Sequence, residues 1–552
     1  MRRQGAIVGS LLLFLGLLAS CGASPERPDE SAKKISQEGN APQAAGAQAS
    51  AQDAGQAKDS APARAEATGK TPRPAEAAEP KPERYMPPEP WREKRPAPGE
   101  APTLKAPAFA QKRLPNGLTV IVSERHDLPL VNISVALRSG SAQDPQGKAG
   151  LAELTYEMLL EGAGKLDAFA LDEAFGDLGT SPQAGVGPDG GGVGVRVLKR
   201  NADSALSLLS TVVRRPRFDK EAFDRKKKKA LADLARLSGS PQFLAQEAFA
   251  ATIFGETHPY GHPSSGTPKS VEGISLRDVK GFYKKHFGPR NAALVVTGDV
   301  TLAEAVKWAK KHFGRWRGKA RPPKAPSEPP VRKREQVVLV PKAALNQTIV
   351  VWGRPAVPIG HPDEFALRIA NDVFGGQFSS RLNMNLREEK GYTYGAYGWY
   401  DGRRGAGVLA AYSAVRADVT GPSVAEFVQE TKGIVEKPIT EAEMEAAREG
   451  ELRGIPGKFE TVDALAATGS ALFQKGLPLD RIERVIKAYR GLSLDTVRET
   501  AKKYFVLDTM QLVLVGDPEV VKTQVPPLKL GALVERPPLG VAPEEGKPSA
   551  AK

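Results

Sequence analysis

Residues with reactive or metal-binding side chains are sparse in this sequence, and few have suitable neighbours. The chain of 552 residues contains one Cys and six His. His258 and His262 are four residues apart, a spacing that on a helix places two imidazoles on one face. Pro259 and Gly261 lie between them and disfavour a helix, so we predict a structural loop here. The other four His are isolated in the sequence and are expected at surface or turn positions.

The single cysteine, Cys21, ends the clearest local motif. Two arginines precede an apolar stretch, residues 6–18, which has the length of a signal peptide and is too short to span a membrane. Leu-Ala-Ser-Cys follows at 18–21 and resembles a bacterial lipobox, in which the Cys thiol takes a diacylglycerol. We predict a lipoprotein signal peptide over 1–21 and lipid anchoring in the cell envelope, with Gly22 favouring the outer membrane of a Gram-negative bacterium. The alternative is an ordinary signal peptide that ends in a chance cysteine.

Composition separates a globular body from two polar tails. Residues 22–103 are rich in Ala, Pro, Glu, Lys and Gln and poor in large apolar residues, so they cannot bury a core and are predicted to be a disordered tether. Residues 523–552 are Pro-rich as well and are predicted to be a disordered tail. The net charge of +14 is spread among acidic residues without a nucleic-acid motif, so we predict no nucleic-acid partner. An anionic lipid surface fits this charge better.

The body between the tails contains a duplication. Residues 275–299 and 493–517 each read as an amphipathic helix followed without a gap by an apolar strand that ends in Gly-Asp. The offset is 218 residues throughout (275 to 493, 299 to 517). We infer two homologous halves, 104–322 and 335–522, joined by a Pro-rich linker, 323–334. Strands and helices in separate runs predict an α+β fold: two α/β sandwiches, each a mostly antiparallel sheet with helices packed on one side.

Several motifs in these halves resemble those of the insulinase/pitrilysin family, the inverted zincins. In the first half they are Leu-Pro-Asn-Gly-Leu at 114–118, Gly-Leu-Ala at 150–152 and His-Pro-Tyr-Gly at 258–261. In the second half they are Gly-Gly-Gln-Phe-Ser-Ser-Arg-Leu at 375–382 and Leu-Arg-Glu-Glu-Lys-Gly-Tyr-Thr-Tyr at 386–394. The resemblance covers nearly all of residues 105–520, and it implies the two-sandwich fold of that family.

The zinc-binding motif of the family is missing from this chain. Active members carry His-x-x-Glu-His on a helix, where the two His bind zinc and the Glu activates water. The matching positions here hold Glu153, Tyr156 and Glu157, and the third ligand position falls at Asp233. We interpret these four as degenerate metal-site positions and predict that this chain binds no metal. Helical geometry predicts Glu153, Tyr156 and Glu157 on one face, away from the core.

The carboxylates of the degenerate site allow two further interpretations. Glu153, Glu157 and Asp233 together would suit a hard ion such as Ca²⁺ or Mn²⁺, although peptidase activity would still lack its general base. The alternative is a solvated acidic face that pairs with the basic run at 225–229. The glycine-rich region after residue 179, where active members have a substrate-facing strand, is compatible with a flexible loop or with a strand edge.

The second half carries the other part of the family's active site. In the family, an Arg and a Tyr seven residues later reach the active site, hold the substrate backbone and help to stabilise the tetrahedral intermediate. Arg387 and Tyr394 have this spacing inside the matching block. A guanidinium and a phenol are hydrogen-bond donors suited to developing negative charge. The alternative is that Arg387 pairs with Glu388 or Glu389 and that Tyr394 packs within a strand.

A broken first-half site beside an intact second-half pair is typical of one kind of subunit in this family. Some bacterial members combine a His-x-x-Glu-His subunit with a subunit that lacks the motif and supplies the Arg and Tyr. The resemblance implies a chain that is inactive alone and binds no cofactor, a homologous partner that carries zinc, and a peptide substrate that extends a strand edge. Two alternatives stay open: a catalytically inactive binding or scaffold lipoprotein on the same fold, and an autonomous hydrolase that uses the acidic cluster.

Overall fold

The structure, a computed structural model, describes residues 105–537. The predicted signal peptide with Cys21, the segment 22–103 and residues 538–552 lie outside the described residues. From Leu104 onward the chain groups into one compact unit and not into two, so the two halves share their packing. Within 105–537, no helix combines the length and the apolar character that crossing a bilayer requires.

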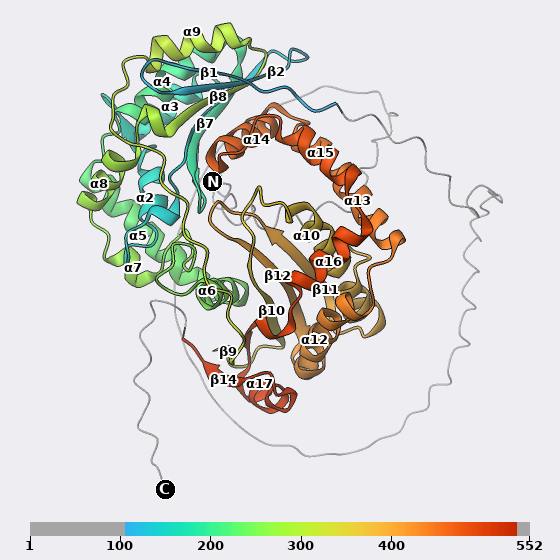
Figure 1. The fold of residues 1–552 in the computed structure, drawn as a ribbon. Helices are drawn as coiled ribbons and strands as arrows, with labels where there is room; N and C mark the ends of the chain where they lie inside the picture. The colour runs from blue at the N-terminus through green and yellow to red at the C-terminus, as the bar shows by residue number, and fades with distance from the viewer. Residues whose placement is uncertain (1–104, 538–552) are drawn as a thin grey trace, which may run out of the picture. The chain divides into compact units, whose positions relative to one another are not determined.

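The first half is built on a six-stranded sheet with the order β1-β2-β8-β3-β7-β6 (Figure 1). Its strands are β1 (Ala110–Arg113), β2 (Thr119–Glu124), β3 (Leu130–Leu137), β6 (Gln183–Val186), β7 (Gly191–Leu198) and β8 (Ala292–Gly298). Only β2 and β8 are parallel neighbours; the other pairs are antiparallel. The glycine-rich region after residue 179 therefore contains a strand, β6, and this strand forms one edge of the sheet.

Helices of the first half, with the exception of α6, cover one face of this sheet. They are α2 (Leu151–Met158), α3 (Ala168–Gly176), α4 (Ala202–Arg214), α5 (Lys220–Leu237), α6 (Pro241–Phe254), α7 (Pro268–Glu272), α8 (Leu276–His286) and α9 (Leu302–Phe313), with a short hairpin of β4 (Gly162–Ala163) and β5 (Leu166–Asp167). Alternate strand residues and the apolar faces of α2, α4, α8 and α9 form one core. α6 does not belong to this core.

The second half repeats the arrangement with a sheet in the order β11-β12-β10-β13-β9-β14. Its strands are β9 (Gln336–Pro341), β10 (Gln347–Ala356), β11 (Thr393–Asp401), β12 (Gly407–Arg416), β13 (Gln511–Gly516) and β14 (Ala532–Glu535). Its helices are α10 (Glu364–Asn371), α11 (Arg381–Asn383), α12 (Thr420–Glu436), α13 (Glu441–Gly454), α14 (Val462–Lys475), α15 (Arg481–Gly491), α16 (Leu494–Tyr504) and α17 (Pro518–Gln524). Two π-helical segments, Asp372–Gly376 and Met384–Glu389, follow α10 and α11.

The duplication predicted from the sequence is present in the structure. α8 and α16 each have 11 residues and begin 218 positions apart, at Leu276 and Leu494. Each helix begins after a serine whose hydroxyl accepts a backbone hydrogen bond, Ser275 from Asp278 (3.3 Å) and Ser493 from Thr496 (3.2 Å). Both halves place a mostly antiparallel sheet against helices. The predicted α+β fold class is confirmed.

The predicted C-terminal boundary is wrong. A disordered tail was expected from residue 523, but β14 pairs in parallel with β9, from Ala532 opposite Gln336 to Glu535 opposite Leu339. The Arg334 side chain also donates a hydrogen bond to the Leu530 carbonyl (2.9 Å). The sequence pattern gave no sign of this strand because it is short and lies half exposed at the edge of the sheet. Residues 523–537 therefore belong to the second half.

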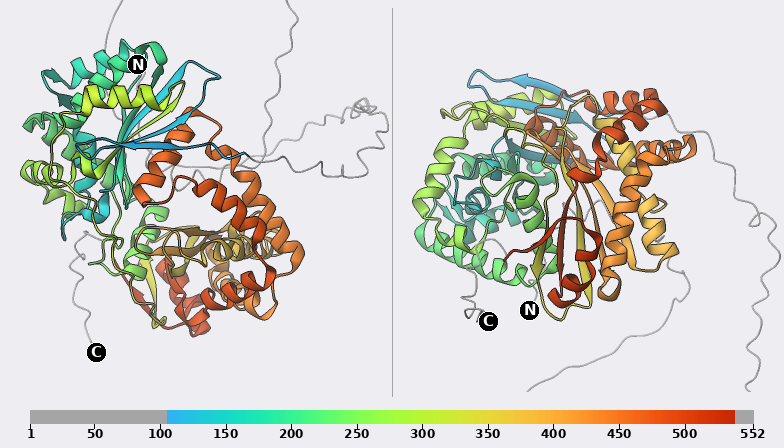
Figure 2. Two further views of the ribbon diagram at one scale, coloured as in Figure 1. Left: turned by 45° about the horizontal axis from the view of Figure 1, so that its top comes forward. Right: turned by 60° about the horizontal axis from the view of Figure 1, so that its bottom comes forward.

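Each sheet is covered on its second face by a helix of the other half. α6 packs its apolar side, with Ala245 and Phe249, against β9, β10 and β13 of the second sheet. α14 crosses β2, β3 and β8 of the first sheet, and Phe473 packs among Ile121 and Val295 (Figures 1 and 2). This exchange explains why the halves form one compact unit: separating them would expose two apolar sheet faces.

We expect the α6 contact to contribute strongly to the stability of both halves. Replacing Phe249, which is buried between α6 and the second sheet, in the variant Phe249→Ala should lower the free energy of unfolding by about 3–5 kcal/mol. The matched control is Phe169→Ala, on α3, where the ring is 76% exposed and the change should stay within about 0.5 kcal/mol. Chemical denaturation followed by circular dichroism measures both. Equal effects of the two changes would contradict the proposed packing role.

Candidate functional site

Tyr156, at the position of the family's catalytic Glu, is buried in the first-half core. Its side chain is 1% exposed, its hydroxyl donates a hydrogen bond to the Ser139 carbonyl (2.8 Å), and its ring lies 5.1 Å from that of Phe287. The ring also occupies the space where a side chain on Gly191 of β7 would lie, with the Tyr156 ring carbon 2.5 Å from an ideal Cβ there. A tyrosine thus fills this position as part of the packing.

The prediction that Tyr156 faces away from the core, together with Glu153 and Glu157, is therefore wrong for Tyr156. α2 is contacted on several sides, by α5, α8, β6 and β7, so most of its positions are buried and no single face is free. Periodicity alone cannot reveal neighbours that approach from distant parts of the sequence. Glu153 and Glu157 retain some exposure as whole residues, but the carboxyl group of Glu153 is buried.

The structure brings the three carboxylates of the degenerate site near one another. Burial, together with the nearby carboxylates of Glu157 and Asp233 and against the opposing effect of Lys229, raises the pKa of Glu153 to about 7. Lys229 also pairs with Asp233, with Nζ 2.5 Å from the carboxylate oxygen. Asp233 therefore pairs with the basic run 225–229 within α5, whereas no ion pair among the described residues joins Glu153 or Glu157 to that run.

These residues do not fit the zinc site of the family. None of the four positions offers an imidazole, the Tyr156 hydroxyl is engaged with a backbone carbonyl, and an ammonium group lies against Asp233. Across residues 105–537, no group of three or more His, Cys, Asp and Glu side chains is arranged to hold a metal ion.

We expect Glu153 to make the stability of the chain depend on pH. Because its pKa in the folded chain, about 7, lies above the ordinary value of 4.5, the folded state favours the protonated carboxyl. Its contribution is fully present below pH 4.5 and is lost as the pH rises through 7. The variant Glu153→Gln should therefore match the unchanged protein at pH 4 and exceed its stability at pH 8 by about 1–3 kcal/mol.

Thermal unfolding between about pH 4 and pH 8 measures this difference, and the exposed Glu173 of α3, in the variant Glu173→Gln, is the matched control. The control should follow the unchanged protein at every pH. A curve for Glu153→Gln that runs parallel to that of the unchanged protein would contradict the assignment.

The histidines of the chain serve in structure. The predicted loop around His258 and His262 is confirmed, and its Tyr260 is buried, with its hydroxyl donating to Asp189 and accepting from the Gly405 backbone N–H (3.2 Å). Asp189 also accepts from the Arg404 backbone N–H (2.9 Å), so this cluster joins the two halves.

Two histidines expected at the surface are instead buried. His286 Nδ1 lies 3.1 Å from Ser139 Oγ, and burial lowers the pKa of His286 to about 4. His312 Nε2 lies 2.9 Å from a carboxylate oxygen of Asp203. Both lie in the last turns of their helices, α8 and α9, and contact residues more than 100 positions away, which isolated positions in the sequence do not indicate.

Arg387 and Tyr394 lie on the surface of the second half. Arg387 is in the π-helical segment before β11; its guanidinium lies 4.6 Å from the ring centre of Phe378 and 3.4 Å from a carboxylate oxygen of Glu388. Tyr394 is 89% exposed near the start of β11. An irregularity in the pairing of β11 with β12, between Thr393 and Ala396, lies at this position and turns the side chain away from the sheet pattern.

The alternative interpretation of Arg387 and Tyr394 agrees with the structure in one part and disagrees in the other. Arg387 does lie beside Glu388, but Tyr394 does not pack within the strand. β11 is an edge strand, so the phenol stands beside backbone groups that no neighbouring strand of the sheet covers. Phe378, which lies beside Arg387, and Met384, which begins the same π-helical segment, are exposed as well. The surface can offer a cation, a phenol and apolar contacts to another molecule.

A groove of about 1310 Å³ runs between the first sheet and α14. Its walls come from β3, β6, β7 and α14, and include the glycines of β7. Across it, Asn132 donates a hydrogen bond to Asp463 (2.8 Å), and Gln474 of α14 donates to the Gly191 carbonyl (3.0 Å). Small residues and free polar groups beside the β6 edge leave room for an extended peptide backbone.

Sequence reasoning missed a buried polar cluster in the second half. Arg368, Asp372, Glu451 and Tyr489 lie together, and the Tyr489 hydroxyl donates to Glu451 (2.9 Å). Burial and the adjacent Glu451 raise the pKa of Asp372 well above its ordinary value. Adding the offset of 218 to position 233 gives Glu451, so Asp233 and Glu451 are equivalent positions in the two halves. The duplication could therefore have indicated this cluster as the counterpart of the degenerate metal site.

The fold defines a metallopeptidase-like protein. The chain belongs to the peptidase M16, or insulinase, family. Residues 119–264 match the family model described as insulinase (peptidase family M16), and residues 273–451 match the model described as peptidase M16 inactive domain. The resemblance to the insulinase/pitrilysin family is confirmed.

Individual relatives agree with this assignment. The chain is similar to a non-peptidase homolog, YmxG, of Helicobacter pylori, with 24% identity over 75% of this chain and 95% of the relative. It is similar to an uncharacterized zinc protease, YmxG, of Bacillus subtilis, with 22% identity over 71% of this chain and 95% of the relative. A solved peptidase M16 inactive domain from Pseudomonas fluorescens superposes with a TM-score of 0.69 and 25% identity, over 74% of this chain and 98% of that domain.

Proposed function

We propose that this chain is the non-zinc subunit of a heterodimeric zinc endopeptidase of the insulinase/pitrilysin type, in which it binds and orients the peptide substrate. A homologous partner with His-x-x-Glu-His would hold the metal. The observation that carries the proposal is the exposed Tyr394, with the partly exposed Arg387, on a free sheet edge, in a chain where the buried Tyr156 takes the position of the catalytic Glu.

The chemistry assigned to this chain is hydrogen-bond donation. Zinc in the partner would supply a Lewis acid and an activated water. Arg387 and Tyr394 would donate to the scissile carbonyl oxygen as it gains negative charge, an interaction that grows stronger in the transition state. The exposed phenol of Tyr394 has the freedom to reach across a subunit interface, and the Phe378 ring beneath the Arg387 guanidinium limits the orientations of that group.

The groove beside β6 is the proposed place for the rest of the peptide. A substrate in extended conformation would add to the free edge of β6 through backbone hydrogen bonds, which require no particular side chain. Asn132, Asp463 and Gln474 line or close the groove and offer polar contacts. Because the neighbouring strand contains glycines, we expect weak selectivity for side chains at this edge.

A second candidate function is peptide binding without cleavage by any subunit. It is favoured by the packed Tyr156 and by the name of the Helicobacter pylori relative, a non-peptidase homolog. In this case the groove would still hold an extended segment, while Arg387 and Tyr394 would contribute to binding alone. The two candidates differ in whether a partner with the zinc motif exists.

The proposal is tested by isolating the tagged chain from its native membranes and identifying proteins that co-purify in stoichiometric amount. In the purified pair, Tyr394→Phe should lower kcat/KM for a peptide substrate about 10²-fold, because one transition-state donor is lost. Stability should change by less than about 0.5 kcal/mol, because the side chain is exposed.

The matched control is Tyr397→Phe, which removes a partly exposed phenol from the same strand and should leave kcat/KM unchanged. Absence of a His-x-x-Glu-His partner, together with absence of chelator-sensitive cleavage, would leave the binding protein as the function. Equal kinetics for the two variants would show that Tyr394 has no part in the reaction.

We also propose that the chain is lipid-anchored in the cell envelope through Cys21, in the outer membrane of a Gram-negative bacterium. The support is the sequence of residues 1–22. Metabolic labelling with an alkyne fatty acid should mark the unchanged protein and not the variant Cys21→Ser. Equal labelling of both would refute the anchor, and membrane fractionation would show which membrane carries the labelled protein.

A further inference from the structure

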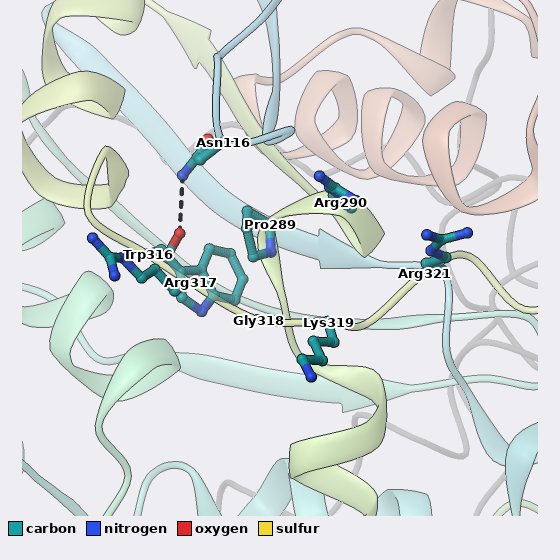
Figure 3. A pocket seen from close by; sticks show the side chains of 8 residues that line it. All are labelled: Asn116, Pro289, Arg290, Trp316, Arg317, Gly318, Lys319 and Arg321. Carbon is teal, nitrogen blue, oxygen red and sulfur yellow. Dashed lines mark hydrogen bonds between the residues drawn. The ribbon is translucent and has the colours of Figure 1, made fainter.

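A basic pocket of about 560 Å³ lies on the first half, away from both sites described above (Figure 3). It is lined by Asn116, Pro289, Arg290, Trp316, Arg317, Gly318, Lys319 and Arg321. Four of these eight residues are cationic and none is acidic. They come from three segments: the turn between β1 and β2, the turn before β8, and the chain that follows α9.

The four cations have no partners among the residues that the structure describes. No ion pair or side-chain hydrogen bond joins Arg290, Arg317, Lys319 or Arg321 to another part of 105–537. Some other cations of the first half do form ion pairs, as Lys148 does with Asp278 and Arg225 with Glu161. Four unpaired positive charges around one hollow repel each other, and an anion bound between them would relieve that repulsion.

The backbone beneath these cations is held firmly. Trp316 is buried, and the Asn116 side-chain amide donates to the carbonyls of Phe313 (2.8 Å) and Trp316 (3.3 Å). Gly288 and Gly318 pack so closely that a Cβ on Gly318 would lie 3.1 Å from the Gly288 Cα. Positions fixed before binding lower the entropy cost of holding a ligand.

The stem of Arg290 is held as well. It lies against Gly117, where φ is +97°, and an ideal Cβ on Gly117 would be 2.6 Å from the Arg290 Cγ. The turn between β1 and β2 therefore needs glycine both for its conformation and for the space that the Arg290 stem occupies. Figure 3 shows the four cations placed around Pro289 and Gly318.

We propose that this pocket is a binding site for a phosphate-bearing ligand. Arginine forks match phosphate oxygens with paired hydrogen bonds, and Lys319 adds a point charge. The volume lies within the usual range of about 300–1,000 Å³ for small-ligand pockets and exceeds a bare phosphate, so it has room for an attached group. The phosphate can belong to a phospholipid headgroup or to a soluble compound. This site is independent of the proposed peptidase role.

The test is isothermal titration calorimetry on the full chain with three probes: inorganic phosphate, dihexanoyl phosphatidylglycerol and dihexanoyl phosphatidylcholine, the lipids below their micelle concentration. The variant Arg290→Gln with Lys319→Gln should bind the favoured probe at least tenfold more weakly. The matched control is Arg277→Gln with Lys284→Gln, which removes one Arg and one Lys charge from exposed positions on α8 and should bind as the unchanged protein does.

The probes distinguish the two sources of phosphate. Tighter binding of phosphatidylglycerol than of inorganic phosphate would assign a lipid headgroup, and the reverse would assign a soluble phosphate compound. A second pocket variant, Arg317→Gln with Arg321→Gln, should also weaken binding. Agreement between the two variants would exclude misfolding of the first as the cause. Equal weakening by the pocket and control variants, or no binding of either anionic probe by the unchanged protein at millimolar concentration, would overturn the proposal.

Discussion

The exchange of covering helices between the two halves is the constraint on which this structure depends. The central strands β8 and β13 are buried at every position, so both faces of each sheet must be shielded from water. Within each half, helices cover only one face of that half's own sheet. α6 closes the second sheet and α14 closes the first, and burial of such apolar surface is worth roughly 25 cal/mol per Å². Neither half is complete without the other.

This constraint also positions the surfaces that could bind a peptide. α14 lies across the first sheet because Phe473 must be buried there, and its polar side then forms a wall of the groove beside β6. The hydrogen bonds of Asn132 with Asp463 and of Gln474 with the Gly191 carbonyl fix the width of that groove. The Tyr260 and Asp189 cluster ties the halves at a second point. The β6 edge and the Arg387 surface are thus carried by one compact body.

The duplicated halves differ at equivalent positions. In the first half, Tyr156 fills the space beside β7, and the positive charge of Lys229 partly offsets the repulsion among the remaining carboxylates. In the second half, the equivalent region buries Asp372 and Glu451 with the guanidinium of Arg368 close by. Buried carboxylates stay in a protein when cations or hydrogen bonds offset the cost of removing them from water. The hydrogen bond from Tyr489 to Glu451 joins α15 to α13, and neither cluster offers the imidazoles that zinc requires.

The sequence by itself determined the duplication, the fold class and the absence of the zinc motif, because these follow from periodicity, a fixed offset of 218 and the identity of a few residues. It could also point to Arg387 and Tyr394. Only the tertiary structure decided that Tyr156 is buried, that Tyr394 is exposed, and that β14 extends the second sheet. These outcomes depend on neighbours contributed by distant segments, and a local pattern in the chain contains no information about which segment will cover it.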